Sequence, residues 1–386
     1  MGRWALWLLA ALLAACASKP VVPLPSPRML FNDALFAAPT ERIDAAAIFR
    51  LTPAMQAYFD DVIAPMQHRR GMQRGLIDAL YSSDKLMLRY DNDFTRSASQ
   101  AFEARAGNCL SLVIMTAAFA RHAEMPVRYH SVHVDPTWGR RGDLYFNFGH
   151  VNVSLGRGPM RSAGVEFNGN DWLTIDFLPQ ADLRGQRYEL IEERTLLAMY
   201  FNNRAAEALA AGKVDDAYWW SRAAIENDPQ LLIAYNTLGV VYRRHGKLDD
   251  SERVLRFAHA LEPRNTNVLG NLAQLLAERG QREESAALLA MLERLQPDPP
   301  FKYFNEGLAA MQRGDYRAAR NLFERELARD PDYHEFHFWL ALAHLQLGDT
   351  WKARKHLAAA AENSGSLEEQ ARYSAKLEKL KAAAVH

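Results

Sequence analysis

The second half of the chain has the most regular pattern of apolar and polar positions, with a period of 34 residues. Glycines and prolines both recur at this spacing. The glycines are Gly212, Gly246, Gly280, Gly314 and Gly348, and the prolines are Pro229, Pro263, Pro297 and Pro331. A fixed period of this length indicates one supersecondary unit that is repeated along the chain.

Within one period the apolar positions predict two helices joined by a turn. The positions in the clearest copy are Tyr235, Leu238, Gly239, Tyr242, Gly246, Leu255, Ala258 and Pro263. Gly239 is expected to let the two helices approach closely, and Gly246 lies in the turn. This set of positions resembles the tetratricopeptide repeat. The resemblance implies an all-α solenoid of five helix pairs over residues 198–365, with a groove for a protein or peptide partner.

A last amphipathic stretch over residues 366–386 predicts a capping helix for the array. We expect its apolar residues to cover the final repeat, while its Lys and Glu side chains face water. The apolar residues concerned are Leu367, Ala371, Leu377 and Leu380.

The first half of the chain lacks this period and mixes helical with strand patterns. Thr52 and Pro53 predict the start of a helix over residues 54–59, and a second short helix is expected over residues 74–81. The apolar run from Cys109 to Ala120 predicts a buried helix with Asn108 as its N-cap.

Strand patterns follow this helix. A strand is expected after Pro126, a second one over residues 148–155 that begins close to His150, and a third over residues 171–177. Alternation places His150 and Asn152 on one face of their strand and Thr174 and Asp176 on one face of theirs. If the two strands are neighbours, the imidazole of His150 and the carboxylate of Asp176 can pair.

The start of the chain predicts export. Arg3 precedes an apolar run from Trp4 to Ala17 that is too short to span a bilayer, which is typical of a secretory signal. Residues Leu13 to Cys16 resemble the lipobox of bacterial lipoproteins. The resemblance implies removal of residues 1–15 and attachment of a lipid such as palmitate to Cys16. The alternative is an ordinary signal peptide in which Cys16 occurs by chance.

Residues 16–30 predict an extended tether, because four prolines between Pro20 and Pro27 prevent a helix or a central strand. Ala17 resembles the outer-membrane default of lipoprotein sorting. The expected location is therefore the bacterial cell envelope, lipid-anchored in the outer membrane and facing the periplasm. Lys and Arg together number 46, as do Asp and Glu, so no overall basic charge predicts a nucleic-acid partner.

Cys109 is the candidate nucleophile. Cys16 and Cys109 are the two cysteines of the chain, so a lipidated Cys16 leaves Cys109 without a disulfide partner in an oxidising compartment. At a helix N-terminus, the macrodipole favours the thiolate, and backbone N–H groups can hold an oxyanion. A thiolate nucleophile needs a histidine base, which in turn needs an orienting group. His150 and Asp176 follow in the order required. The alternative is that Cys109 is a small buried apolar residue.

Across residues 85–185 these features resemble the transglutaminase-like superfamily of papain-fold cysteine enzymes. The resemblance implies an α+β papain-like domain over residues 31–190 with a catalytic triad of Cys109, His150 and Asp176, and with Trp172 and Asp176 at the family's spacing. The insertion between His150 and Asp176 is longer than the family's usual hairpin. Asp171 therefore stays open as an alternative to Asp176, and the insertion is a candidate lid.

Two other sets of polar residues lie near these positions in the sequence. His130, His133 and Asp135 are not expected to bind a metal, because histidines three residues apart on a strand face opposite sides. Asn92 and Asn108 are candidate side-chain donors to an oxyanion. No cofactor is expected, and calcium dependence stays open.

Two functions remain after these observations. The first is an envelope-anchored thiol hydrolase, either a protease or an amidase, or an acyltransferase, that acts on peptide or side-chain amides of a protein or peptide substrate. The second is a catalytically inactive lipoprotein scaffold that uses its repeats for protein–protein interaction.

Overall fold

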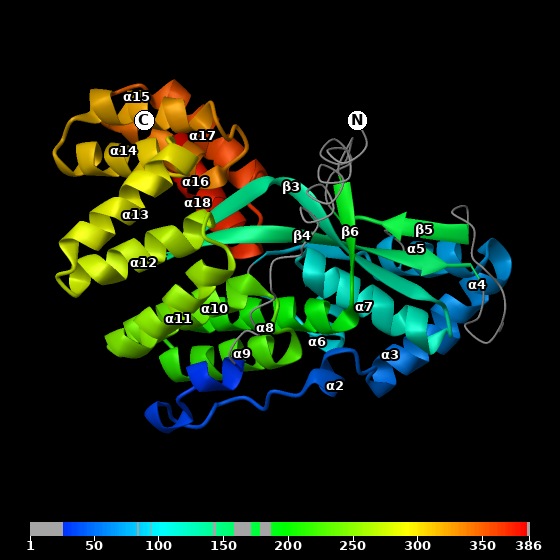
Figure 1. The fold of residues 1–386 in the computed structure, drawn as a ribbon. Helices are drawn as coiled ribbons and strands as arrows, with labels where there is room; N and C mark the ends of the chain where they lie inside the picture. Colours follow the sequence, from blue (N-terminus) through cyan, green and yellow to red (C-terminus); the bar gives the residue numbers. More distant parts are fainter. Residues whose placement is uncertain are drawn as a thin grey trace, which may run out of the picture.

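The structure is a computed structural model that describes residues 26–82, 85–92, 94–141, 144–157, 171–177 and 187–383. The signal segment, Cys16 and the greater part of the tether lie outside the described residues. Within the described ranges, no helix has both the length and the apolar character needed to cross a bilayer. We call residues 26–191 the mixed half and residues 193–383 the repeat half (Figure 1).

Short helices build the first part of the mixed half. They are η1 (Pro27–Leu30), η2 (Asp33–Leu35), α2 (Ala45–Ile48), α3 (Pro53–Tyr58), η3 (Phe59–Ile63), α4 (Ala64–Arg70), α5 (Met72–Tyr81) and α6 (Ala98–Ala104). The start of α3 follows the sequence prediction, since Thr52 Oγ1 accepts a hydrogen bond from the N–H of Met55 and Pro53 takes the first helical turn.

Helix α7 (Cys109–His122) is the central helix of the mixed half. Every side chain from Leu110 to Ala120 is buried, because the helix has strands on one side and short helices on the other. Its first residue is Cys109 and its N-cap is Asn108, as the sequence predicts.

A four-stranded antiparallel sheet packs against α7, in the order β5-β4-β3-β6. The strands are β3 (Val127–Arg141), β4 (Leu144–Gly156), β5 (Trp172–Ile175) and β6 (Arg187–Ile191). A small parallel pair, β1 (Arg89–Tyr90) and β2 (Ala106–Gly107), lies just before the Cys109 helix.

The expected start of the strand that carries His150 was wrong. Strand β4 begins at Leu144, so His150 lies in its middle, because β3 and β4 form a long hairpin that pairs as far as Arg141 and Leu144. The pairing is interrupted once, where Val132 lies opposite His150 and the next partners are Thr137 and Phe148. This bulge lies beside His150, a position at which bulges often redirect side chains in active sites.

Five helix pairs follow in the repeat half. They are α8 (Glu193–Ala210) with α9 (Val214–Asn227), α10 (Leu232–Arg244) with α11 (Leu248–Leu261), α12 (Thr266–Glu278) with α13 (Arg282–Leu295), α14 (Lys302–Gln312) with α15 (Tyr316–Leu327), and α16 (His334–Gln346) with α17 (Thr350–Glu362). The five periodic glycines have φ between 74° and 81°, a left-handed conformation that ends the first helix of each pair. A Cβ on Gly239 would lie 2.6 Å from Leu255, so this glycine is required by the close helix contact.

Helix α18 (Leu367–Ala383) follows the last pair, but its expected contact residues were partly wrong. Leu367 is 49% exposed, whereas Tyr373 is the side chain that is buried. Its hydroxyl bonds with Nδ1 of His334 and its ring packs against Phe338, both on α16. The contact is therefore aromatic and polar, which the leucine spacing does not predict.

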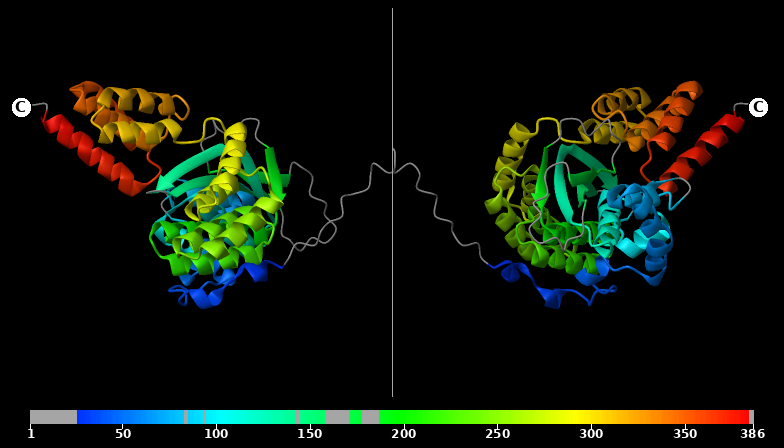
Figure 2. Two further views of the ribbon diagram at one scale, coloured as in Figure 1. Left: turned by 60° about the vertical axis from the view of Figure 1, so that its left-hand side comes forward. Right: turned by 90° about the vertical axis from the view of Figure 1, so that its right-hand side faces the viewer.

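The repeat helices curve around the sheet, which lies inside their arc (Figure 2). At the start of the arc, residues 30–41 lie along the repeats, and we call them the N-terminal strap. The ring of Phe36 stacks on Tyr218 of α9 at 3.9 Å, and Tyr242 of α10 donates to the carbonyl of Leu30 at 2.9 Å. One apolar core runs from Leu30 through α7 to Val268. The first repeats therefore share a core with the mixed half.

Candidate active site

Cys109 is half-buried at the first turn of α7. Asn108 Oδ1 accepts hydrogen bonds from the N–H of Ser111 at 2.9 Å and from its hydroxyl at 2.7 Å. Because first-turn N–H groups have no acceptor within the helix, those of Cys109 and Leu110 are the remaining backbone donors next to the sulfur. A thiol in this position can contact a substrate and has donors close by for a developing oxyanion.

His150 is 4% exposed, and its Nε2 lies 2.7 Å from Oδ1 of Asp176. The thiol of Cys109 lies close enough to the same imidazole to interact with it. Since Nε2 faces the carboxylate, Nδ1 is the ring nitrogen left for the sulfur. Burial lowers the pKa of His150, but the hydrogen bonds to Asp176 and Cys109 and their charges outweigh it and raise this pKa to about 9. The imidazole of His150 is therefore positively charged at neutral pH.

Of the two candidate carboxylates, it is Asp176 that lies beside His150. Its second oxygen, Oδ2, accepts a hydrogen bond from Nδ2 of Asn152 at 3.1 Å. Asp171 lies at the start of β5, where its carbonyl accepts a bond from Gln73 on α5 at 2.9 Å. Hydrogen bonds on both carboxylate oxygens hold Asp176 in one orientation relative to the imidazole.

The register of the sheet explains why these side chains meet. Strands β4 and β5 pair with Ser154 opposite Thr174, and the two hydroxyl oxygens are 2.7 Å apart. Two residues further along each strand, Asn152 and Asp176 meet on the same face. His150 is the next residue of that face, which agrees with the alternation in the sequence.

The other candidates have different roles. His130 Nδ1 bonds with Oδ1 of Asn152 at 2.9 Å, so His130 extends the polar network behind Asp176. Among the residues that the structure describes, no group of three His, Cys, Asp or Glu side chains could hold a metal ion. The side chains of His133 and Asp135 lie outside the described part.

Of the two asparagines predicted as oxyanion donors, Asn108 is not free for that role. Both ends of the Asn108 amide are engaged, since its Nδ2 donates to Oγ1 of Thr95 at 2.9 Å. The side chain of Asn92 packs against Gly365, and its N–H donates to the Gly365 carbonyl at 3.0 Å. The backbone donors at the start of α7 remain the candidates for an oxyanion.

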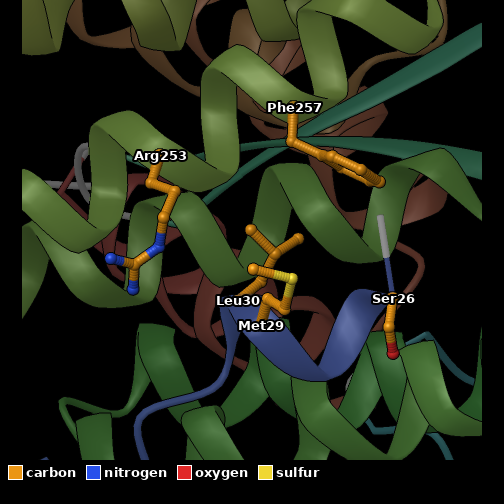
Figure 3. A pocket seen from close by; sticks show the side chains of 5 residues that line it. All are labelled: Ser26, Met29, Leu30, Arg253 and Phe257. Atoms are coloured by element: carbon orange, nitrogen blue, oxygen red, sulfur yellow. The ribbon is translucent and has the colours of Figure 1, made fainter. Parts of the chain in front are cut away.

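A small hollow of about 240 Å³ lies elsewhere, between η1 and α11 (Figure 3). Its lining residues are Ser26, Met29, Leu30, Arg253 and Phe257. None of them belongs to the elements that carry Cys109 and His150. The hollow is therefore separate from the candidate active site.

Comparison with known proteins decides the nature of the repeat half. Two family models, both described as tetratricopeptide repeat, match residues 242–304 and 304–368. The second half of this chain is an array of tetratricopeptide repeats. Neither match extends to the residues around Cys109. No curated protein matches the chain.

Several solved structures are similar to about half of the chain. Yeast Tom70 is 19% identical over 48% of this chain and 40% of its own, with a TM-score of 0.35. A thermophilic tetratricopeptide-repeat protein of Thermus thermophilus is 22% identical over 47% of this chain and 98% of its own, with a TM-score of 0.31. PilF of Pseudomonas aeruginosa is 22% identical over 49% of this chain and 94% of its own, with a TM-score of 0.29. At these scores the likenesses carry no conclusion about function.

Proposed function

We propose that the chain is a thiol-dependent acyl-transfer enzyme of the transglutaminase-like kind, with Cys109 as nucleophile, His150 as base and Asp176 as orienting carboxylate. The observation that carries the proposal is that the half-buried thiol interacts with an imidazole whose Nε2 is hydrogen-bonded to a doubly held carboxylate. The order of the elements supports a papain-like domain. The nucleophile opens a central helix, and the histidine and the aspartate follow on neighbouring strands.

The proposed reaction begins with the Cys109 thiolate and the protonated His150. The sulfur attacks the carbonyl carbon of a peptide or side-chain amide, and the N–H groups at the start of α7 hold the oxyanion. His150 gives its proton to the departing amine as the C–N bond breaks, which leaves a thioester on Cys109. His150 then takes a proton from water, whose oxygen attacks the thioester and releases the acid. An amine in place of water would give transamidation; we propose hydrolysis as the main reaction.

We further propose that Cys16 carries a lipid and that residues 16–30 tether the protein to the outer membrane on its periplasmic side. The lipobox-like sequence before Cys16 and the prolines after it support this location. Replacement of Cys16 by Ser should move the protein from the membrane fraction to the soluble periplasmic fraction. An unchanged membrane fraction would contradict a lipid anchor at this residue.

The repeat array supports recognition of a protein substrate or partner, because tetratricopeptide repeats bind peptides and proteins. The alternative function, an inactive scaffold, is separated from the enzyme by one experiment. Intact envelopes are treated with a thiol-directed electrophile, and polypeptides that change length or mass are identified in cells with the wild-type protein and with Cys109→Ala or Cys109→Ser. The enzyme predicts labelling and product changes that both substitutions abolish. Identical product patterns in all three strains would leave the scaffold.

A further inference from the structure

Thr95 lies between the first repeat helix and the Cys109 helix, and it is fully buried. Its Oγ1 accepts hydrogen bonds from Nδ2 of Asn108 at 2.9 Å and from Nδ2 of Asn203 at 3.2 Å. Its backbone N–H donates to Oε1 of Glu207 at 2.7 Å. Two residues of α8, four positions apart on one helix face, therefore hold Thr95 from the repeat side.

Thr95 in turn fixes the N-cap of α7. The amide of Asn108 donates to Thr95 through Nδ2, so that Oδ1 points at Ser111 and accepts its N–H. If the amide were flipped, Nδ2 of Asn108 would face the N–H of Ser111, and two hydrogen-bond donors would point at each other. The neighbouring N–H of Arg96 donates to the Ser111 hydroxyl at 2.7 Å, which joins the same segment to the first turn of α7 a second time.

The repeat pattern itself shows that Glu207 is exceptional. The equivalent positions in the next two repeats are Val241 and Leu275, and both are fully buried apolar residues. Removing a glutamate carboxylate from water at a position that otherwise belongs to the repeat core costs free energy. This cost is offset only if the carboxylate accepts a specific hydrogen bond. In the first repeat that bond is the one to Thr95, assisted by Arg204, which lies 3.5 Å from the Glu207 carboxylate.

The side chain of Asn203 has a different kind of partner from the side chains at the equivalent repeat positions. Thr237 and Asn271 occupy this position in the next two repeats, and Asn271 donates to the side chain of Asn236 at 2.9 Å, within the array. In the first repeat the side chain instead contacts the mixed half. The contacts of Asn203 and Glu207 therefore converge on Thr95.

We propose that Asn203 and Glu207 are positioning residues for Cys109. Through Thr95 and Asn108 they hold the first turn of α7 at the place where the thiol meets His150. This inference rests on the proposed function and makes α8 a part of the catalytic unit as well as a repeat helix. It assigns to the first repeat a task that the other repeats do not have.

The test measures the rate at which iodoacetamide alkylates Cys109 in the full-length protein, by peptide mass spectrometry, from pH 5 to pH 10. Asn203→Ala and Thr95→Val should slow alkylation at pH 6 roughly tenfold and leave the rate at pH 10 unchanged, because alignment with His150 matters only where an unassisted thiol is protonated. Thr95→Ser and Glu207→Gln, which keep the acceptors, should retain the wild-type profile. Asn271→Ala is the matched control at the same repeat position and should also retain it.

Thermal unfolding of each variant separates positioning from loss of fold, and Asn203→Ala keeps the test valid if Thr95→Val unfolds. If Asn203→Ala and Asn271→Ala have the same pH profile, the positioning role is overturned while the proposed function stands. A wild-type profile equal to that of His150→Ala would overturn both.

Discussion

The two ends of the repeat array contact the mixed half in different ways. At the near end, α8 to α11 share a continuous apolar core with α7, the sheet and the N-terminal strap. At the far end, α14 to α16 pack around their own cluster, centred on Phe304, and Trp138 is the residue of the mixed half that joins it. The near repeats are therefore one body with the candidate active site, whereas the far repeats are a separately packed unit.

The far end contacts the mixed half through the hairpin of β3 and β4 as well as through the bond from Asn92 to Gly365. Arg140 pairs with Glu335 of α16 at 2.5 Å, and its guanidinium lies 5.1 Å from the centre of the Phe304 ring. The same hairpin carries His150 further along β4. The hairpin that reaches the far repeats therefore also carries the candidate base.

The same substitution, glycine to alanine, at equivalent positions of a near repeat and a far repeat should produce the largest difference between the two ends. A Cβ would lie 2.6 Å from Leu255 in Gly239→Ala and 2.5 Å from Phe323 in Gly307→Ala. Each should cost about 1–3 kcal/mol through overpacking. In Gly239→Ala this overpacking cost should lower the stability of the core that the near repeats share with the mixed half. Because α7 belongs to that core, the reactivity of Cys109 should also decrease. In Gly307→Ala, amide hydrogen exchange should increase in α14 to α18 and leave α7 protected. Equal exchange in α7 for both variants would remove the distinction between the ends.

A smaller effect is expected from Arg140→Ala. The pair is partly buried, with 18% and 17% of the two side chains exposed, so its loss should cost about 1–2 kcal/mol at the far contact. Hydrogen exchange should increase in β3, β4 and α16. A double-mutant cycle with Glu335→Ala gives the coupling between the two side chains. A coupling near zero would mean that the ion pair does not hold the hairpin and that its contacts with the aromatic cluster do.

The smallest effect is a pH dependence of opposite sign at the two ends. At the far end, His337 and His356 meet with their Nδ1 atoms 3.0 Å apart, and His344 stacks on His356. Burial, with the neighbouring histidine charges, lowers the pKa of His356 to about 4. The unfolded chain, in which this histidine has its ordinary pKa of 6.5, binds the proton more readily than the folded protein does. The free energy of unfolding of α16 and α17 is therefore at its full value above pH 6.5 and decreases as the pH falls towards 4.

At the near end the sign reverses. The pKa of His150 is raised to about 9, so the folded protein binds this proton more readily than the unfolded chain does. The stabilisation that results is fully present below pH 6.5 and is lost as the pH rises through 9. Hydrogen exchange at pH 5, 7 and 9.5 should therefore show increased opening of α16 and α17 in acid, and increased opening around α7 and β4 in alkali. His356→Gln should remove the acid effect. Acid opening that persists in this variant would assign it to other groups.

The sequence predicts the elements whose signals are local. The repeats are readable because each helix pair packs on its neighbours and needs a left-handed glycine at a fixed spacing, as at Gly246. The start of α7 is readable because Asn108 caps an apolar run. The meeting of His150 with Asp176 follows from strand alternation once the strands are known to be neighbours.

The sequence does not predict contacts between distant segments. The docking of Arg140 on Glu335 joins residues 195 positions apart, and no periodic pattern records it. The contacts of the N-terminal strap with the repeats, and the burial of Tyr373 against α16, also join segments that are distant in the sequence. Glu207 did leave a signal, because it breaks the apolar pattern of its repeat position, and comparison of the aligned repeats could have singled it out.

In the proposed mechanism, His150 and Asp176 activate the thiol of Cys109. The most direct measurement is the alkylation rate of Cys109 at pH 6 in wild type, His150→Ala and Asp176→Asn, because an ordinary thiol with a pKa of about 8.5 is almost entirely protonated there. We predict fast alkylation of the wild type and a rate at least about tenfold lower in both variants, with the three rates converging at pH 10. Equal rates in all three proteins at pH 6 would contradict it.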